Sequence, residues 1–241
     1  MVDALFGDER LAVLYDPIEE DRDDLPPYVD LVVELGAWSV VDLGCGTGTF
    51  ACLLAERGLR VVGVDPAVAS LAIARRKPGA DRVQWIDGDA TALAHIRADV
   101  VTMTGNVAQV FTSDDAWLTT LRECRKVLGD SGSLVFETRD PARAAWSEWN
   151  REASMRVLRL PGGDRLTTWV ELVSVALPLV SFRQVFLFDD RAEALVSDST
   201  LRFRSLDEIA ETLSVSAFEL REVRDAPDRP GREFVILAAP G

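Results

Sequence analysis

Residues 40–50 read VVDLGCGTGTF, a β-branched run followed by three glycines at alternate positions. This order predicts a buried strand, a tight loop and the first turn of a helix. Glycines let a ligand approach the backbone closely, and the free N–H groups of a helix N-terminus attract polar or anionic groups. We therefore expect a ligand against this loop, and we expect any side chain at Gly44 or Gly46 to collide with that ligand.

Short β-branched runs alternate with helical periods from residue 38 to residue 140, the pattern of a parallel sheet with crossover helices. A helix after the glycine loop is predicted to close at Gly58 in the left-handed conformation, and another helix to run from Ser113 to Gly129. The predicted strands are 39–43, 60–64, 82–86, 99–103 and 133–137.

The rhythm changes after residue 140, where extended segments follow one another without helices. Turns predicted at 161–164 and 189–190 make these segments an antiparallel insert. A helix returns at Ser205, which has capping-box spacing to Glu208, and a closing hairpin ends the chain. The pattern predicts an α/β fold: a doubly wound, seven-stranded, mostly parallel sheet with helices on both faces, an antiparallel last strand and an antiparallel β insert after the fifth strand.

Two further acids follow strands of the predicted sheet. Asp65, followed by Pro66, ends the second strand, where a carboxylate can accept hydrogen bonds from both hydroxyls of a ribose. Asp89 and Ala90 follow the third strand. The glycine spacing is GxGxG rather than the GxGxxG of dinucleotide enzymes, although those enzymes use a similar strand, loop and acid. A nucleoside-containing cofactor is expected.

With Asp42 two residues before the first glycine, the sequence resembles the class I S-adenosylmethionine-dependent methyltransferases over residues 38–140. The resemblance implies S-adenosyl-L-methionine as the cofactor, with Asp42 near its methionine portion, Asp65 at the ribose and Asp89 with Ala90 at the adenine. It also implies that the end of the fourth strand borders the methyl group, with Asn106 as the polar group that orients the acceptor. The implied cofactor-binding set is Tyr15, Asp42, Gly44, Cys45, Gly46, Gly48, Asp65, Pro66, Asp89, Ala90, Thr104 and Gly105.

The N-terminal segment, with Tyr15, Asp16 and a later Tyr28, resembles the helical lid of the small-molecule methyltransferases. The resemblance divides the chain into a lid (1–36), a cofactor-binding core (37–140 and 205–241) and an inserted β subdomain (141–204) that covers the acceptor. Cys45 is interpreted as a small loop residue rather than a nucleophile, and His95 as structural. Trp146 and Trp149 either line the acceptor pocket or pack in a core.

Composition narrows the partners. The 241 residues include 26 basic and 40 acidic side chains, a formal net charge of −14. The sequence contains no basic run, whereas nucleic-acid binding depends on clustered Lys and Arg side chains. Three cysteines without a CxxC pair indicate neither disulfides nor a metal site. We expect a cytoplasmic monomer or homodimer that binds a small molecule and neither nucleic acid nor membrane.

The predicted reaction is methyl transfer to a small-molecule acceptor by in-line displacement. The sulfonium is an activated leaving group, so orientation and exclusion of water are the main tasks of the protein. A general base depends on the acceptor, whose identity the sequence leaves open. Two alternatives remain at this point: an NAD-dependent oxidoreductase on the same sheet, and a non-catalytic module that binds the cofactor.

Overall fold

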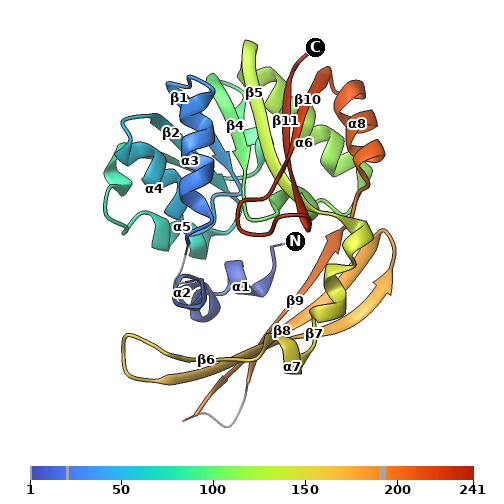
Figure 1. The fold of residues 1–241 in the computed structure, drawn as a ribbon. Helices are drawn as coiled ribbons and strands as arrows, with labels where there is room; N and C mark the ends of the chain where they lie inside the picture. The colour runs from blue at the N-terminus through green and yellow to red at the C-terminus, as the bar shows by residue number, and fades with distance from the viewer. Residues whose placement is uncertain (1, 20–21, 190–193) are drawn as a thin grey trace.

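The structure is a computed structural model that describes residues 2–19, 22–189 and 194–241. Residues 1, 20–21 and 190–193 lie outside this description, and they include Asp190 of the turn predicted at 189–190. A large α/β unit and a smaller β-sheet face each other, and two short helices lie between them (Figure 1). No helix within the described ranges is long and apolar enough to cross a lipid bilayer.

The large unit is built on one seven-stranded sheet in the order β10-β11-β5-β4-β1-β2-β3. Strands β1 to β5 pair in parallel, whereas β11 is antiparallel to both of its neighbours. The predicted fold class, with an antiparallel last strand, is confirmed. The strands are β1 (Ser39–Leu43), β2 (Arg60–Asp65), β3 (Val83–Asp87), β4 (Ala98–Met103), β5 (Leu128–Arg139), β10 (Phe218–Asp225) and β11 (Glu233–Pro240).

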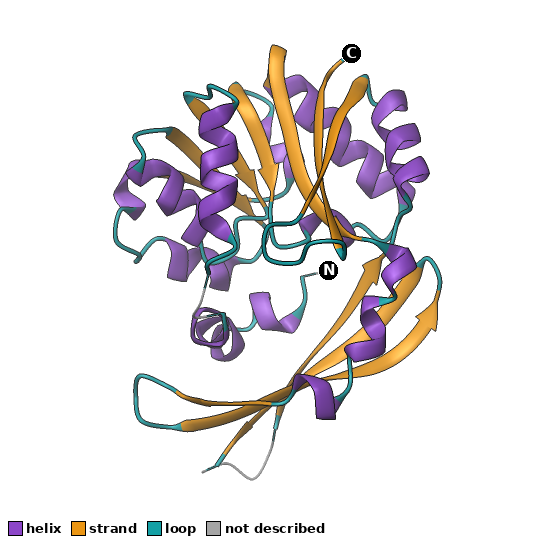
Figure 2. Cartoon of the chain, in the orientation of Figure 1, coloured by secondary structure: helices purple, strands orange, loops and turns teal. Residues whose placement is uncertain are grey.

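Helices cover both faces of this sheet (Figure 2). Successive residues of a strand point to opposite faces, so Val40 and Val41 enter two separate cores. Val41 packs in the cluster that holds Trp117 of α6, and Val40 packs in the cluster that holds Tyr28 of α3. The helices are α3 (Leu25–Glu34), α4 (Thr49–Glu56), α5 (Val68–Ala74), α6 (Asp114–Val127) and α8 (Leu206–Val215).

Local signals explain several helix ends. The Ser113 hydroxyl accepts a hydrogen bond from Ala116 N at the start of α6, and Ser205 with Glu208 forms the predicted capping box of α8. Gly58 has a φ of +86°, as predicted for a residue that closes α4. The predicted closing role of Gly129 is wrong, because α6 ends at Val127 and the chain turns directly into β5 at Leu128. No left-handed residue is needed there.

The insert is a four-stranded antiparallel sheet in the order β6-β7-β8-β9, which confirms the predicted antiparallel β insert. Its strands are β6 (Arg156–Arg159), β7 (Arg165–Ala176), β8 (Leu179–Phe188) and β9 (Leu195–Arg202), preceded by the short helix α7 (Arg151–Ser154). It lies beyond the carboxyl ends of the parallel strands (Figure 1). This is the edge where ligands of open α/β sheets bind.

Two N-terminal helices, α1 (Ala4–Gly7) and α2 (Glu9–Ile18), lie between the large sheet and the insert (Figure 1). Leu11 and Leu14 of α2 share a hydrophobic cluster with Phe186 of β8. Helix α3, by contrast, packs on the large sheet through Tyr28 and Val32. The N-terminal 36 residues therefore contribute both to the covering layer and to the core.

Candidate active site

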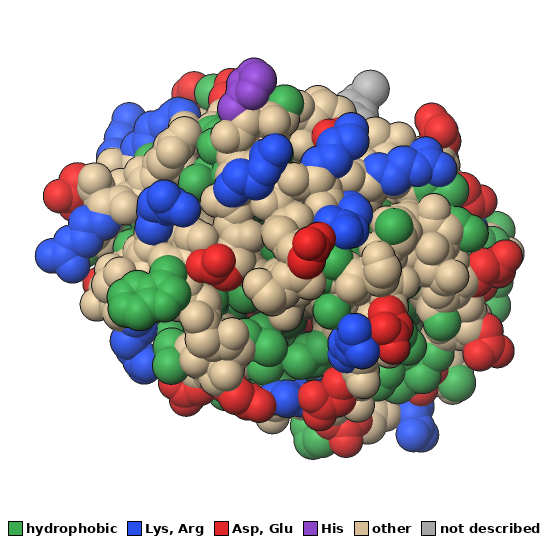
Figure 3. Space-filling view, turned by 90° about the horizontal axis from the view of Figure 1, so that it is seen from above, with side chains coloured by type: hydrophobic (Ala, Val, Ile, Leu, Met, Phe, Trp, Pro, Cys, Tyr) green, Lys and Arg blue, Asp and Glu red, His purple; other side chains and the backbone are tan. Residues whose placement is uncertain are grey.

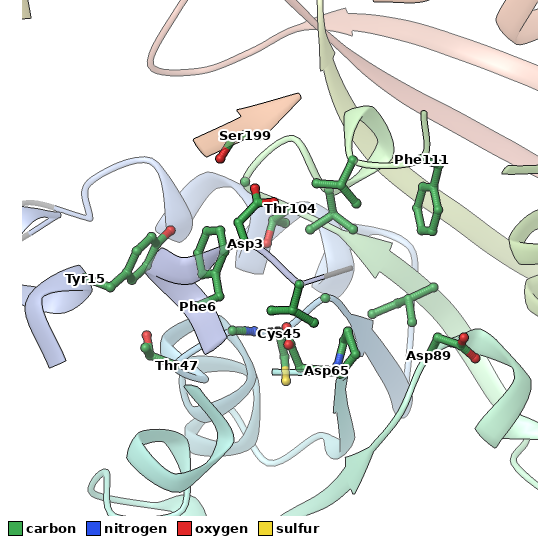
Figure 4. Close-up of a pocket in the computed structure, with 18 of the residues that line it drawn as sticks. Asp3, Phe6, Tyr15, Cys45, Thr47, Asp65, Asp89, Thr104, Phe111 and Ser199 are labelled. Carbon is green, nitrogen blue, oxygen red and sulfur yellow. Dashed lines mark hydrogen bonds between the residues drawn. The ribbon is translucent and has the colours of Figure 1, made fainter. Parts of the chain in front are cut away.

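A cavity of about 890 Å³ lies between the carboxyl ends of the parallel strands, α1, α2 and the insert (Figure 4). Of the site residues predicted from the sequence, only Gly48 and Asn106 are missing from its lining. The others line it together: Tyr15, Asp42, Gly44, Cys45, Gly46, Asp65, Pro66, Asp89, Ala90, Thr104 and Gly105. Residues from four strand ends and the N-terminal segment thus meet in one space.

The three glycines of the loop all have left-handed backbones, but for different reasons. Their φ angles are +76° at Gly44, +53° at Gly46 and +80° at Gly48. A Cβ at Gly48 would lie 2.5 Å from the Trp85 ring, and one at Gly44 would lie 2.6 Å from Val107, so the expected collision at Gly44 is with the protein itself. A Cβ at Gly46 would meet nothing within 4 Å. Only Gly46 keeps the loop open towards the cavity.

Asp65 ties the glycine loop to the start of α5. Its Oδ2 accepts a hydrogen bond from Gly46 N at 2.7 Å, and its Oδ1 accepts one from Ala67 N at 2.7 Å. Burial raises the pKa of this carboxyl, and the two backbone hydrogen bonds oppose the rise. Each oxygen retains a further acceptor site. The residue therefore shapes the loop and can still bind hydroxyl groups in the cavity.

Asp42 presents an unsatisfied carboxylate oxygen at the cavity wall. Its Oδ1 accepts a hydrogen bond from the Thr102 hydroxyl at 3.2 Å, whereas its buried Oδ2 has no partner among the described residues. The residue is 1% exposed, and burial raises its pKa to about 7. Buried polar atoms in folded proteins are nearly always hydrogen-bonded. The orphaned oxygen therefore marks a place where a ligand donor belongs.

Arg22 lines the same cavity and was missed from the sequence. Its guanidinium contacts both oxygens of Asp24 at 2.9 Å, which fixes the side chain in place. A guanidinium is suited to bind a carboxylate. The only signal in the sequence is that Arg22 is the one cation of an otherwise acidic stretch, residues 19–24.

The Tyr15 and Asp16 pair holds α2 over the glycine loop. Asp16 Oδ1 accepts a hydrogen bond from the Thr47 hydroxyl at 2.6 Å, and Lys77 Nζ lies 2.8 Å from Asp16 Oδ2. The Tyr15 ring packs against Phe6 with centroids 5.5 Å apart. Burial raises the pKa of Tyr15 to about 12, so its hydroxyl stays protonated and can donate a hydrogen bond.

Asn106 lies behind the loop rather than in the cavity wall. Its backbone is left-handed, with a φ of +60°, and its Nδ2 donates a hydrogen bond to Glu233 Oε2 at 3.0 Å. Asn106 N also donates to Glu137 Oε1 at 2.9 Å, and the hydroxyl of Tyr28 donates to Glu137. Asn106 therefore belongs to a buried polar network that supports Thr104 and Gly105 from behind.

Three residues with reactive side chains have no chemical role in this geometry. The pKa of Cys45 is raised by burial and by the charges of Asp42 and Asp65, which is the opposite of what a thiolate nucleophile needs. Cys124 is buried in the core. His95 is exposed and lies outside the cavity lining; Figure 3 shows the histidine on the outer surface.

Asp89 caps the short turn that follows β3. Its Oδ1 accepts hydrogen bonds from Thr91 N at 2.9 Å and from the Thr91 hydroxyl at 2.6 Å, which orients Ala90 beside the cavity. Trp146 and Trp149 take the packing alternative, because both pack on Phe203 and neither belongs to the lining. The insert contributes other lining residues that the sequence did not reveal: Val173, Ser181, Phe182, Arg183, Asp198, Ser199 and Thr200.

Comparisons with known proteins agree with this geometry. A family model described as a methyltransferase domain matches residues 40–132. A demethylmenaquinone methyltransferase from Thermotoga maritima is 30% identical over 196 residues, which cover 80% of this chain and 75% of that protein. A cypemycin N-terminal methyltransferase from a Streptomyces species is 35% identical over 133 residues, 54% of this chain, and the match spans only about half, 52%, of that relative.

The fold agrees as well. The CcbJ methyltransferase of Streptomyces caelestis superimposes with a TM-score of 0.79, 22% sequence identity and coverage of 96% of both chains. The glycine loop, the strand-end acids and these relationships together show that the chain belongs to the class I S-adenosylmethionine-dependent methyltransferases.

Proposed function

We propose that this protein transfers a methyl group from S-adenosylmethionine to a small-molecule acceptor held between the sheet and the insert. The observation that carries the proposal is the pairing of an orphaned Asp42 oxygen with an open face at Gly46 in one cavity. These two features fit a ligand that has a cationic hydrogen-bond donor for the Asp42 oxygen and an extended body that can lie against Gly46. Family membership supplies the class of cofactor, and the cavity supplies the space for an acceptor.

The residues present fit the cofactor. Asp42 Oδ2 would accept a hydrogen bond from the ammonium group of S-adenosylmethionine, and Arg22 would bind the carboxylate of the same molecule. Because Gly46 has no side chain, the cofactor could lie close to the loop backbone there. Asp65 would hold the ribose hydroxyls, and Asp89 with Ala90 would contact the adenine. When bound, S-adenosylmethionine supplies a methyl group on a positively charged sulfur, which makes the sulfur a good leaving group.

The protein's own contribution is orientation and exclusion of water. Helices α1 and α2 line the cavity on one side, and Asp16 links α2 to Thr47 and Lys77. The inserted sheet closes the other side. Holding two reactants in line inside such a space removes the entropic cost of bringing them together. We propose α1 and α2, residues 4–18, as the lid, the β insert as the acceptor cover, and α3 as part of the core.

Asn106 is proposed as a positioning residue rather than one that contacts the acceptor. Its amide hydrogen-bonds to Glu233 and its backbone to Glu137, so it fixes the loop that carries Thr104 and Gly105. These two residues line the cavity directly. The cavity is lined by acids and apolar side chains with few cations, which favours a small molecule over nucleic acid as the partner.

Calorimetry tests the cofactor assignment. Tight binding of S-adenosylhomocysteine without binding of NADH is expected, and the reverse result would refute the proposal. Asp65→Ala is expected to weaken this binding by about 1.5–3 kcal/mol, because charge-assisted hydrogen bonds are lost. Asp81→Ala serves as a control, since Asp81 is exposed on the surface and absent from the lining. Cofactor binding without product from a broad acceptor panel would support the non-catalytic alternative.

A further inference from the structure

The half of the cavity that faces away from the glycine loop has its own composition. Its walls come from residues 2–6, the loop after β4 and the inserted sheet. Apolar side chains dominate these walls, among them Phe6, Phe111 and Phe182. The charged side chains that line it are Asp3, Arg183 and Asp198. These three decide which charge an acceptor can carry.

Arg183 and Asp198 neutralise each other. They are direct partners across the β8–β9 pair, and the guanidinium contacts both carboxylate oxygens, at 2.7 Å and 2.8 Å. The opposite charges of a bidentate pair cancel, so this pair adds no net charge to this half of the cavity. Among the described side chains of this half, Asp3 is therefore the charged one without an ion-pair partner from another side chain.

Asp3 does not use its side chain in the usual way for its position. It is the N-cap residue of α1, and its carbonyl oxygen accepts hydrogen bonds from Phe6 N and Gly7 N at 3.0 Å. An Asp at this position normally caps the helix through its carboxylate. Here the carboxylate makes no cap bond and instead lines the cavity.

The position of Asp3 is fixed from two sides. Leu5 N donates a hydrogen bond to Ser197 Oγ of β9 at 2.8 Å, and the Ser70 hydroxyl of α5 donates to Phe6 O at 2.9 Å. Ser199, which Figure 4 shows with Asp3 among the lining residues, hydrogen-bonds to the carboxylate. Burial raises the pKa of Asp3, and the Ser199 hydrogen bond and the positive charge of the chain N-terminus oppose the rise. The carboxylate is thus held at one place in the apolar wall.

We propose that Asp3 binds the amino group of the methyl acceptor, which is a primary or secondary amine on an apolar body, and takes up the proton that this nitrogen releases. The inference rests on the proposed function and narrows it to one substrate class. A carboxylate against aromatic walls favours a cation and disfavours an anionic acceptor. The aromatic side chains Phe6, Phe111 and Phe182 provide the apolar surface for the rest of the molecule.

In this reaction Asp3 accepts the proton, and sulfur keeps the electron pair of the broken bond. An amine that enters as an ammonium ion passes a proton to a carboxylate oxygen of Asp3, which frees the nitrogen lone pair. The lone pair forms the new N–C bond while the C–S bond breaks, and the electron pair of that bond stays on sulfur. A secondary or tertiary ammonium product results, and the proton on Asp3 leaves to solvent.

The test compares three probes of one shape: 2-phenylethylamine, 2-phenylethanol and phenylacetate. Their binding is measured by calorimetry at millimolar concentrations, with and without S-adenosylhomocysteine. In the wild-type protein the amine is expected to bind at least about tenfold more tightly than the alcohol, since hydrogen bonds to charged groups contribute more than neutral ones. Phenylacetate is expected to bind most weakly. Asp3→Asn should abolish the preference for the amine.

The control is Asp23→Asn, which removes the same charge from an exposed position of the N-terminal segment outside the lining. It should leave the ranking of the probes unchanged. An unaltered ranking in Asp3→Asn, an alcohol that binds as well as the amine, or no amine binding at all would overturn the inference. Affinity for S-adenosylhomocysteine should be the same in wild type and Asp3→Asn, and its absence in the wild type would count against the proposed function instead.

Discussion

The sheet side of the cavity presents backbone groups and buried carboxylates at strand ends, whereas the opposite side presents side chains from α1, α2 and the insert. On the sheet side, Gly46, Asp65 and Ala67 are joined by two hydrogen bonds within 21 residues of chain. On the opposite side, Leu5 and Ser197 meet across 192 residues. A cofactor site made by neighbouring strand ends can persist while the acceptor site changes through substitutions elsewhere.

The glycine loop contains a similar contrast, because Gly46 faces open space whereas Gly48 faces the Trp85 ring. Substitutions at these two glycines give the largest expected change in the free energy of unfolding. Gly46→Ala and Gly48→Ala both place a side chain on a left-handed backbone, which costs about 1–2 kcal/mol. At Gly48 the new methyl also meets Trp85 and the Ala74 Cβ at 2.7 Å, so overpacking adds about 1–3 kcal/mol. Urea denaturation should therefore show Gly48→Ala as the less stable variant by that margin.

Ligand binding should reverse the order of the two variants. The methyl of Gly46→Ala points into open space in the cavity, where it would meet the ligand. Gly46→Ala should therefore weaken binding of S-adenosylhomocysteine more than Gly48→Ala does, although it lowers the free energy of unfolding less. Gly63→Ala is a useful third variant, because its methyl also meets Trp85 without lying in the lining. Equal stability losses at Gly46 and Gly48 would show that the Trp85 contact relaxes without cost.

These contacts also show where sequence reasoning succeeds and fails. β1 was placed at its observed bounds, and Gly58 and the capping box at Ser205 were identified, because each signal lies within a few residues of its effect. The contact between Gly48 and Trp85, the φ of Asn106 and the cavity position of Asp3 depend on residues far away in the chain. Arg22 was missed because no local pattern distinguishes a cavity cation from a solvated one.

Asp42, on the sheet side, leads to a prediction about how the free energy of unfolding depends on pH. Its pKa is raised by burial to about 7 in the folded protein, against about 4 in an unfolded chain. Between these values the folded state holds a proton that the unfolded state has released. The free energy of unfolding should therefore fall as pH rises from about 4 to 7, by at most ~1.4 kcal/mol per pH unit from this group.

Asp42→Asn is expected to remove this contribution, since the amide does not titrate. Thermal or urea unfolding of both proteins across that pH range, without ligand, measures the difference. Bound S-adenosylhomocysteine should offset the destabilisation in the wild type above pH 7, because the ionised oxygen then has an ammonium partner. A wild-type slope identical to that of Asp42→Asn would mean that Asp42 ionises in the folded protein as it does in water.

The smallest expected effect concerns Asp16, whose contacts connect the two sides of the cavity. Asp16 carries α2, and its bonds to Thr47 and Lys77 belong to the glycine loop and to the segment after α5. Asp16→Ala removes both contacts from a partly exposed site, so binding of S-adenosylhomocysteine should weaken by only about threefold to fivefold. Asp16→Asn keeps an acceptor for the Thr47 hydroxyl but loses the charge, and its affinity for S-adenosylhomocysteine should fall between those of wild type and Asp16→Ala.

Added salt should weaken binding in the wild type more than in Asp16→Asn, because salt screens the ion pair with Lys77. Glu9→Ala, on an exposed position of the same helix, controls for the loss of a charge alone. If Asp16→Ala bound the ligand as tightly as the wild type, helix α2 would be held in place by its packing on Phe186 of the insert, and the two sides of the cavity would be coupled only through that apolar contact.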